Sequence, residues 1–221
     1  MAHYPERVEG HGAAVRRHGL FVFAALLALY VLAEWLMAVV WDTSMGSQRA
    51  LTTSTWVALG AVMAWWARPT GNEIQAALLT GIVIAVGDFF YEGIMVARDV
   101  WRYHGPFMVL GLPVDMFWDF VLLGFTFSLS LALFRGWKDP LRARVAYVSL
   151  GSLALGSWAW FHNSVAADQG FVTFAESIDR DTPLFIVGNY GFMALLLAVI
   201  AALNAAFLGG LSRRPSRAGR S

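Results

Sequence analysis

Long apolar stretches alternate with short polar segments along the whole chain. Each stretch is close to or longer than the about 20 residues that cross a bilayer as an α-helix. Six stretches are predicted as transmembrane helices, over residues 20–41, 51–67, 75–97, 106–134, 145–166 and 183–210. The pattern therefore predicts an all-α integral membrane protein in which about six helices form a bundle.

Composition supports this fold class. The chain is 58% hydrophobic and 14% charged, and its mean hydropathy of +0.57 is too high for a soluble domain. No cysteine is present, which excludes disulfides, thiolate zinc sites and iron–sulfur clusters. The net charge of +1 gives no reason to expect a nucleic-acid partner.

The distribution of Lys and Arg predicts the orientation. With the N-terminus inside, the outer loops hold four basic residues, Arg49, Arg98, Arg102 and Arg180, and the inner segments hold the other 12 of the 16. Because basic residues concentrate in cytoplasmic segments, both termini should be cytoplasmic. We expect a cytoplasmic tail over 1–19, one transmembrane domain over 20–210 and a basic tail over 211–221, in a multi-pass protein of the cell membrane, by expectation a bacterial inner membrane.

Two segments at the expected outer side have ambiguous local structure. Gly111 and Pro113 interrupt the fourth apolar stretch, and a proline there either kinks a helix or starts it afresh. The acidic loop 167–182 could be a short interfacial helix or a solvated loop, and the solvated loop is favoured.

Carboxylates occur as two pairs within apolar stretches. Asp88 and Glu92 are four residues apart in the third stretch, and Asp115 and Asp119 are four apart in the fourth. That spacing places each pair on one helix face. An ionised carboxylate at mid-bilayer costs roughly 2.5–3.5 kcal/mol, so these acids should face protein or water. They form the candidate site.

Counting from the predicted span ends at ~1.5 Å per residue places the two pairs at overlapping depth in the outer half of the bilayer. The third and fourth stretches are joined by a short loop and should be antiparallel neighbours. The same count places four further polar residues in the outer half: Glu34, His162, Asn163 and Asn189. The inner halves are almost purely apolar. We therefore expect a carboxylate-lined cavity in the outer half of the bundle.

Clustered acids next to aromatic rings suggest a reaction class. Like charges in a low dielectric repel, so one or two of the acids should carry a proton near pH 7 and serve as general acids. Aromatic faces stabilise cations, which suits carbocation chemistry. The candidate substrate-binding residues are six aromatics and three polar residues: Phe89, Tyr91, Trp101, Tyr103, Phe117, Trp118, His162, Asn163 and Asn189.

Residues 88–125 resemble a pattern of integral-membrane lycopene cyclase domains, in which W-x-Y and a glycine precede a span that opens with Leu-Pro-x-Glu-Glu and aromatics. The matching residues are Trp101 and Tyr103, Gly105 or Gly111, and the run Leu112 to Trp118. The chain departs from the pattern where Asp115-Met116 replaces Glu-Glu. Small polytopic terpenoid cyclases resemble it more distantly. The resemblance implies acid-initiated chemistry on an isoprenoid.

The favoured hypothesis is a membrane terpenoid or isoprenoid cyclase or isomerase that needs no cofactor and no metal. Asp115 is the first choice for the initiating acid and Asp88 the second, and the other catalytic candidates are Glu92, Asp119 and Glu34. The expected partners are a lipid-soluble isoprenoid substrate and membrane lipid, with a homo-oligomer or a protein partner left open.

Three alternatives remain open at this point. The acids with His162 could ligate a metal, although the chain lacks Glu-x-x-His pairs. They could belong to a proton-coupled transporter or to a non-catalytic subunit of a membrane assembly. They could also only fix helix packing, by accepting hydrogen bonds from Tyr, Trp, Arg98 or Arg102.

Overall fold

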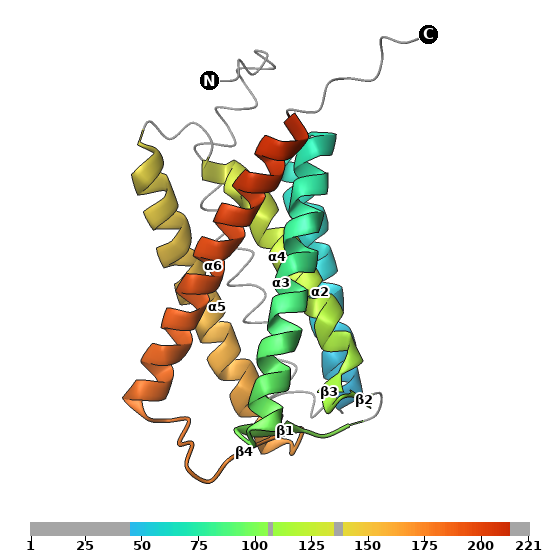
Figure 1. The fold of residues 1–221 in the computed structure, drawn as a ribbon, viewed down its shortest axis with the longest axis vertical. Helices are drawn as coiled ribbons and strands as arrows, with labels where there is room; N and C mark the ends of the chain where they lie inside the picture. Colours follow the sequence, from blue (N-terminus) through green and yellow to red (C-terminus); the bar gives the residue numbers. More distant parts are fainter. Residues whose placement is uncertain (1–44, 106–107, 135–138, 213–221) are drawn as a thin grey trace.

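The computed structural model describes residues 45–105, 108–134 and 139–212 (Figure 1). This part of the chain is mostly helical, which confirms the predicted secondary-structure class. Its five α-helices are α2 (Met45–Ala67), α3 (Gly71–Ala97), α4 (Val114–Ser130), α5 (Pro140–Asp168) and α6 (Pro183–Ser212). The predicted first helix, 20–41, and the N-terminal tail lie outside the described residues, as do residues 213–221.

Two of the helices are long and apolar enough to cross a membrane. They are α3, with 27 residues, and α6, with 30 residues. At ~1.5 Å per residue both exceed the roughly 30 Å hydrocarbon thickness of a bilayer. The other helices, α2, α4 and α5, overlap the second, fourth and fifth predicted stretches. A bundle of six spans stays a prediction.

Local sequence explains where the helices begin. Thr70 and Glu73 form a capping box at the start of α3, in which the Thr70 amide donates to Glu73 Oε2 at 2.7 Å. Asp139 caps α5 by accepting a hydrogen bond from the Leu141 amide at 2.9 Å, and Pro140 occupies the first helical position. Both arrangements satisfy amide groups that a helix start leaves unpaired.

The prediction of one helix over 106–134 is wrong at its outer end. Strands β2 (Met108–Val109) and β3 (Leu112–Pro113) form a hairpin there, and α4 starts only after Pro113. Leu110 and Gly111 make its two-residue turn with φ of 54° and 78°, the left-handed backbone that such turns need. A short 3₁₀ helix, η1 (Leu131–Phe134), follows α4. The sequence predicted either a kinked helix or a new helix start at Pro113, and the structure has a new helix start there.

The loop 167–182 is neither a helix nor simply solvated. It contains strand β4 (Val172–Phe174), which pairs antiparallel with β1 (Trp101–Tyr103), so that Trp101 lies opposite Phe174 and Tyr103 opposite Val172. Figure 1 shows both strands at the end of the bundle where α3 ends and α6 begins, here called the outer end. Two segments about 70 residues apart thereby cover this end.

Glycines allow the closest helix contacts. The helices α3 and α4 pack against each other most extensively, and a Cβ added to Gly124 would lie 2.7 Å from the Cα of Gly81. Between α5 and α6, a Cβ on Gly156 would lie 2.4 Å from the ring of Tyr190. Larger residues at either place would push the helices apart.

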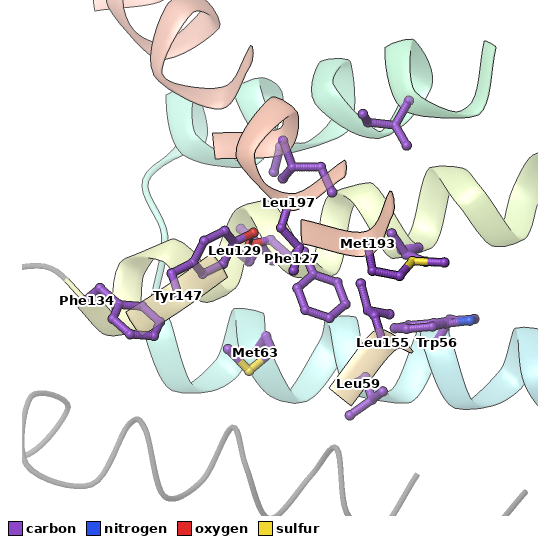
Figure 2. Packing of buried hydrophobic residues seen from close by; sticks show 14 of the residues in the cluster. Trp56, Leu59, Met63, Phe127, Leu129, Phe134, Tyr147, Leu155, Met193 and Leu197 are labelled. Atoms are coloured by element: carbon purple, nitrogen blue, oxygen red, sulfur yellow. Dashed lines mark hydrogen bonds between the residues drawn. The ribbon is translucent and has the colours of Figure 1, made fainter. Parts of the chain in front are cut away.

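A hydrophobic core fills the bundle on the side away from the outer end (Figure 2). Trp56 of α2 is fully buried and lies 6.2 Å from the Phe127 ring of α4. Tyr147 of α5 is also fully buried, and its hydroxyl donates to the Phe127 carbonyl at 3.1 Å. Leu197 and Ile200 of α6 complete the core.

Candidate functional site

A cavity of about 320 Å³ lies between α3, α4, α5 and α6, with β1 and β4 covering its outer side. Most of its lining is apolar or aromatic. Its polar side chains are Thr52, Asp88, Tyr91, Glu92, Trp101, Tyr103, Asp119, His162, Asn163 and Asn189. The structure thus brings most of the candidate residues expected in the outer half onto one cavity.

Asp88 and Glu92 reach the cavity from α3, one helical turn apart. Each is only 8% exposed. Glu92 Oε2 accepts hydrogen bonds from Trp101 Nε1 at 2.7 Å and from the Tyr103 hydroxyl at 3.0 Å. Both donors come from β1, where alternate residues point to the same side of the strand.

Asp88 differs from Glu92 in its surroundings. Within the described part of the chain, no group donates a hydrogen bond to its carboxyl. A buried polar group without a partner is costly and uncommon. Asp88 is therefore a carboxyl that faces the cavity and is free to interact with what occupies it.

Asp119 enters the cavity from α4. Its Oδ1 accepts a hydrogen bond of 2.6 Å from the Thr53 hydroxyl of α2, and the side chain is half-buried. This bond joins two helices that also pack against each other. Asp119 therefore has a clear structural role in addition to lining the cavity.

The polar residues of α5 and α6 are also engaged. The Asn189 amide donates to the Gly156 carbonyl at 2.7 Å, which ties α6 to α5. The His162 ring stacks on Trp158, with centroids 5.1 Å apart. Asn163 lines the cavity close by, and its carbonyl accepts a hydrogen bond from Arg180 at 3.5 Å.

Aromatic rings form much of the wall. Tyr91 of α3 stacks on Phe192 of α6 at 5.2 Å between centroids. Trp101 lies 6.1 Å from Phe174, which in turn lies 6.2 Å from Phe185. Rings from two helices and both outer strands therefore surround the carboxyl pair.

Three predicted substrate-binding residues lie elsewhere. Phe89, Phe117 and Trp118 form a separate aromatic row, with centroids 6.5 Å and 5.6 Å apart, and Trp118 is 58% exposed. Each helical residue is rotated about 100° from the one before it. Phe89 follows Asp88 and Trp118 precedes Asp119, so both rings point in a different direction from the acid beside them, and neither lines the cavity.

Two predicted acids have side chains that the structure does not describe. Asp115 is the second residue of α4, and its side chain lies outside the described part. Glu34 lies outside it altogether. Their assignment as catalytic residues stays a prediction.

Sequence reasoning missed about half of the lining. Trp158, Ala159 and Ala166 of α5 are three or four residues from His162 or Asn163, and Phe185, Phe192 and Met193 of α6 are three or four from Asn189. Extending helical spacing from the polar residues would have found them. Phe171, Val172 and Phe174 also line the cavity, but no local pattern marks them as part of it.

The charged groups at the outer end pair among themselves. Arg102 Nε donates to Asp99 at 2.6 Å, and this hydrogen bond raises the pKa of the exposed guanidinium. Arg180 donates to the Ser164 carbonyl at 3.2 Å and to Asp168 at 3.5 Å. His104 and Thr173 are hydrogen-bonded across the strands. None of these hydrogen bonds involves Glu92, whose two donors are a tryptophan and a tyrosine.

Among the described residues, no group of three or more His, Asp or Glu side chains is arranged to hold a metal ion. A scan against protein-family models, a search of curated proteins and a search of solved structures each found no match to this chain. The resemblance to lycopene cyclase domains stays an expectation from the sequence.

Proposed function

We propose that the protein is a membrane-embedded isoprenoid cyclase or isomerase in which Asp88 supplies the initiating proton and Glu92 accepts the final one. The observation that carries the proposal is the contrast between these neighbours. Glu92 receives two hydrogen bonds, and Asp88 receives none from the described residues. Donated hydrogen bonds favour a carboxylate over a carboxylic acid. A neutral acid and a carboxylate one turn apart form a general acid and base pair.

The reaction balances without a cofactor. The O–H bond of Asp88 breaks as its proton forms a C–H bond with a terminal alkene, which leaves a carbocation. A second alkene of the same chain attacks the cation and closes a ring. Glu92 then takes a proton from the carbon beside the new cation, and a C=C bond forms. Glu92 then releases its proton to solvent and Asp88 takes a proton from solvent, so that both groups are restored and the product is an isomer of the substrate.

The cavity suits a cationic intermediate of a hydrocarbon substrate. Tyr91, Trp101 and Phe192 present aromatic rings next to the carboxyl pair, and such rings stabilise cations by roughly 2 kcal/mol or more when water is excluded. Several of the polar groups are already bonded within the protein, among them Glu92, Asp119 and Asn189. An apolar polyene that partitions into the membrane is therefore the substrate class.

This proposal moves the first choice of acid from Asp115 to Asp88. Asp88 faces the cavity and is buried, whereas the Asp115 side chain lies outside the described part. We also propose the six-span arrangement with both termini cytoplasmic. The long apolar helices α3 and α6 support a membrane location.

A proton-relaying subunit is the second candidate, since intramembrane carboxylates one turn apart also serve as relays. The core around Trp56, Phe127 and Leu197 argues against a continuous path, because it is apolar and closely packed on the inner side of the cavity.

Expression of the full chain in an isoprenoid-producing host tests the proposal. Wild-type membranes should contain an isoprenoid isomer of unchanged mass, detected by mass spectrometry of the organic extract, that is absent with Asp88→Asn. Glu73→Gln is the matched control, because Glu73 is a buried acid of the same helix that does not line the cavity. An extract identical in wild type and Asp88→Asn would contradict the proposal.

A further inference from the structure

The cavity reaches the molecular surface beside Gly188 of α6. Among the described lining residues, Gly188 is exposed, while the others are buried or half-buried. A Cβ added to Gly188 would meet no atom within 4 Å. The backbone at this position therefore borders open space that is continuous with the cavity.

The surface around Gly188 is apolar. Leu184 is 84% exposed, Val187 is 68% exposed and Leu195 is 63% exposed. Residues four and seven positions apart share a helix face, so Leu184 and Leu195 lie along the same side of α6 as Gly188, and Val187 is its neighbour in the chain. An exposed apolar face of this kind is suited to lipid contact. The opening is therefore directed sideways toward the bilayer.

Helical spacing also identifies the edges of the opening. Phe192 lies one turn after Gly188 on α6 and stacks on Tyr91 of α3, so this ring pair bounds the opening on the inner side. Figure 1 shows α6 leaning away from α3 toward its start at Pro183.

We propose that a long isoprenoid chain occupies this opening, with its reacting end in the cavity next to Asp88 and its remaining length passing Gly188 into the lipid. The inference rests on the proposed function for the identity of the occupant. A cavity of about 320 Å³ is at the low end of the roughly 300–1,000 Å³ found for small-molecule sites. It holds one end of a polyprenyl chain, and the rest needs a path to an apolar medium.

Binding to paired glycine variants tests this opening. The full chain in phospholipid nanodiscs is titrated with radiolabelled geranylgeraniol, which has four isoprene units, and with geraniol, which has two. Gly188→Trp should weaken geranylgeraniol binding by about tenfold or more and change geraniol binding much less. Gly210→Trp is the control, because Gly210 is also exposed on α6 with no atom within 4 Å of an added Cβ, lies at the other end of the helix and does not line the cavity.

Equal geranylgeraniol affinity in both tryptophan variants would overturn the inference, as would a wild type that binds neither alcohol. A second measurement covers the case in which Gly188→Trp does not fold. The chain has no cysteine, so a spin label can be attached to Gly188→Cys alone. Collisions with oxygen should exceed those with a water-soluble nickel chelate, and geranylgeraniol should reduce the collisions with oxygen at Gly188→Cys but not at Gly210→Cys. Preferential collision with the chelate would contradict an opening toward lipid.

These outcomes are separable from the proposed chemistry because they do not depend on turnover. If Gly188→Trp excludes geranylgeraniol but the wild type converts no isoprenoid, the opening stands and the cyclase fails. If the wild type forms product but both tryptophan variants bind alike, the chemistry stands and the opening fails.

Discussion

Neighbouring carboxyl groups on one helix face acquire different surroundings in this protein. Asp88 and Glu92 are equally buried, at 8% exposure, yet only Glu92 is oriented by described donors, Trp101 and Tyr103. The difference arises because β1 crosses the outer end of α3 at the level of Glu92. Two carboxyl groups one helical turn apart can therefore take different catalytic roles, one as an acid and the other as a base.

The hydrogen bond from Tyr103 to Glu92 should affect turnover. Tyr103→Phe removes only the hydroxyl, and a hydrogen bond to a charged group contributes about 1.5–3 kcal/mol. We expect turnover of an isoprenoid substrate to fall about tenfold, since 1.4 kcal/mol corresponds to that factor, with little change in KM. Steady-state kinetics in nanodiscs measure both constants.

Tyr190→Phe is the matched control for that variant. It removes a hydroxyl paired with Ser157 at 2.8 Å, and Tyr190 does not line the cavity. Similar thermal stability of the two variants, together with a turnover loss confined to Tyr103→Phe, is the expected result. Equal losses of turnover would make the Tyr103 bond a purely structural one.

Much of the site at the residue scale could be predicted from the sequence. Spacing by four and depth from the predicted span ends were enough to gather Asp88, Glu92, His162 and Asn189 on one cavity. The partners of Glu92 were only partly foreseeable, because the direction of Trp101 depends on a strand that exists only when paired with β4. A direction set by a partner about 70 residues away has no local signal.

At the scale of the elements, the close contact between α3 and α4 sets the position of Asp88 on α3 relative to Asp119 on α4, along the axis of the bundle. A Cβ on Gly81 would lie 2.3 Å from the Val121 carbonyl oxygen, which no side-chain adjustment can relieve because the clash is with backbone. Asp88 lies two turns after Gly81 on the same helix. Close packing at Gly81 thus supports the position of Asp88.

Gly81→Ala should destabilise the protein by about 1–3 kcal/mol, the usual cost of overpacking. Gly87→Ala on the same helix should leave stability unchanged or raise it by up to about 1 kcal/mol, because no atom lies within 4 Å of an added Cβ there and alanine favours helix. Thermal unfolding in detergent, followed by circular dichroism, compares the two. Equal stability of both variants would refute the close contact.

Elements with a strong local pattern were predicted well, and those without one were missed. Apolar length located α3 and α6, and Pro113 indicated where α4 could begin. The hairpin β2–β3 was missed because its turn places Leu110, a helix-favouring residue, in a left-handed conformation, which side chains such as leucine rarely adopt. Strands β1 and β4 were missed because three-residue strands carry too few positions for an alternating pattern.

At the scale of the whole molecule, the account requires that the covered end of the cavity faces outward. The strands β1 and β4 lie at the end where α3 ends and α6 begins, and the charge distribution along the sequence predicts that this end is the outer one. A substrate would then reach the site from the outer half of the bilayer. This orientation can be measured without knowing the substrate.

Single-cysteine variants of the cysteine-free chain measure the orientation in intact cells. Glu176→Cys, in the loop after β4, should react with a membrane-impermeant maleimide. Arg142→Cys, at the start of α5, should react only after the cells are opened. Glu176 and Arg142 are both exposed, so access from one side of the membrane is the variable. Reaction of Arg142→Cys alone in intact cells would reverse the orientation.

The origin of the transferred proton tests the central claim most directly. The purified full chain is incubated in deuterium oxide with the isoprenoid that it converts, and the product is analysed by mass spectrometry. Because the Asp88 carboxyl exchanges with solvent, we expect one deuterium on a carbon of each product molecule. Asp88→Asn should form product at least about 100-fold more slowly, the lower range for general acid catalysis, and Glu73→Gln at the wild-type rate. Product without deuterium, or full activity of Asp88→Asn, would contradict acid initiation by Asp88.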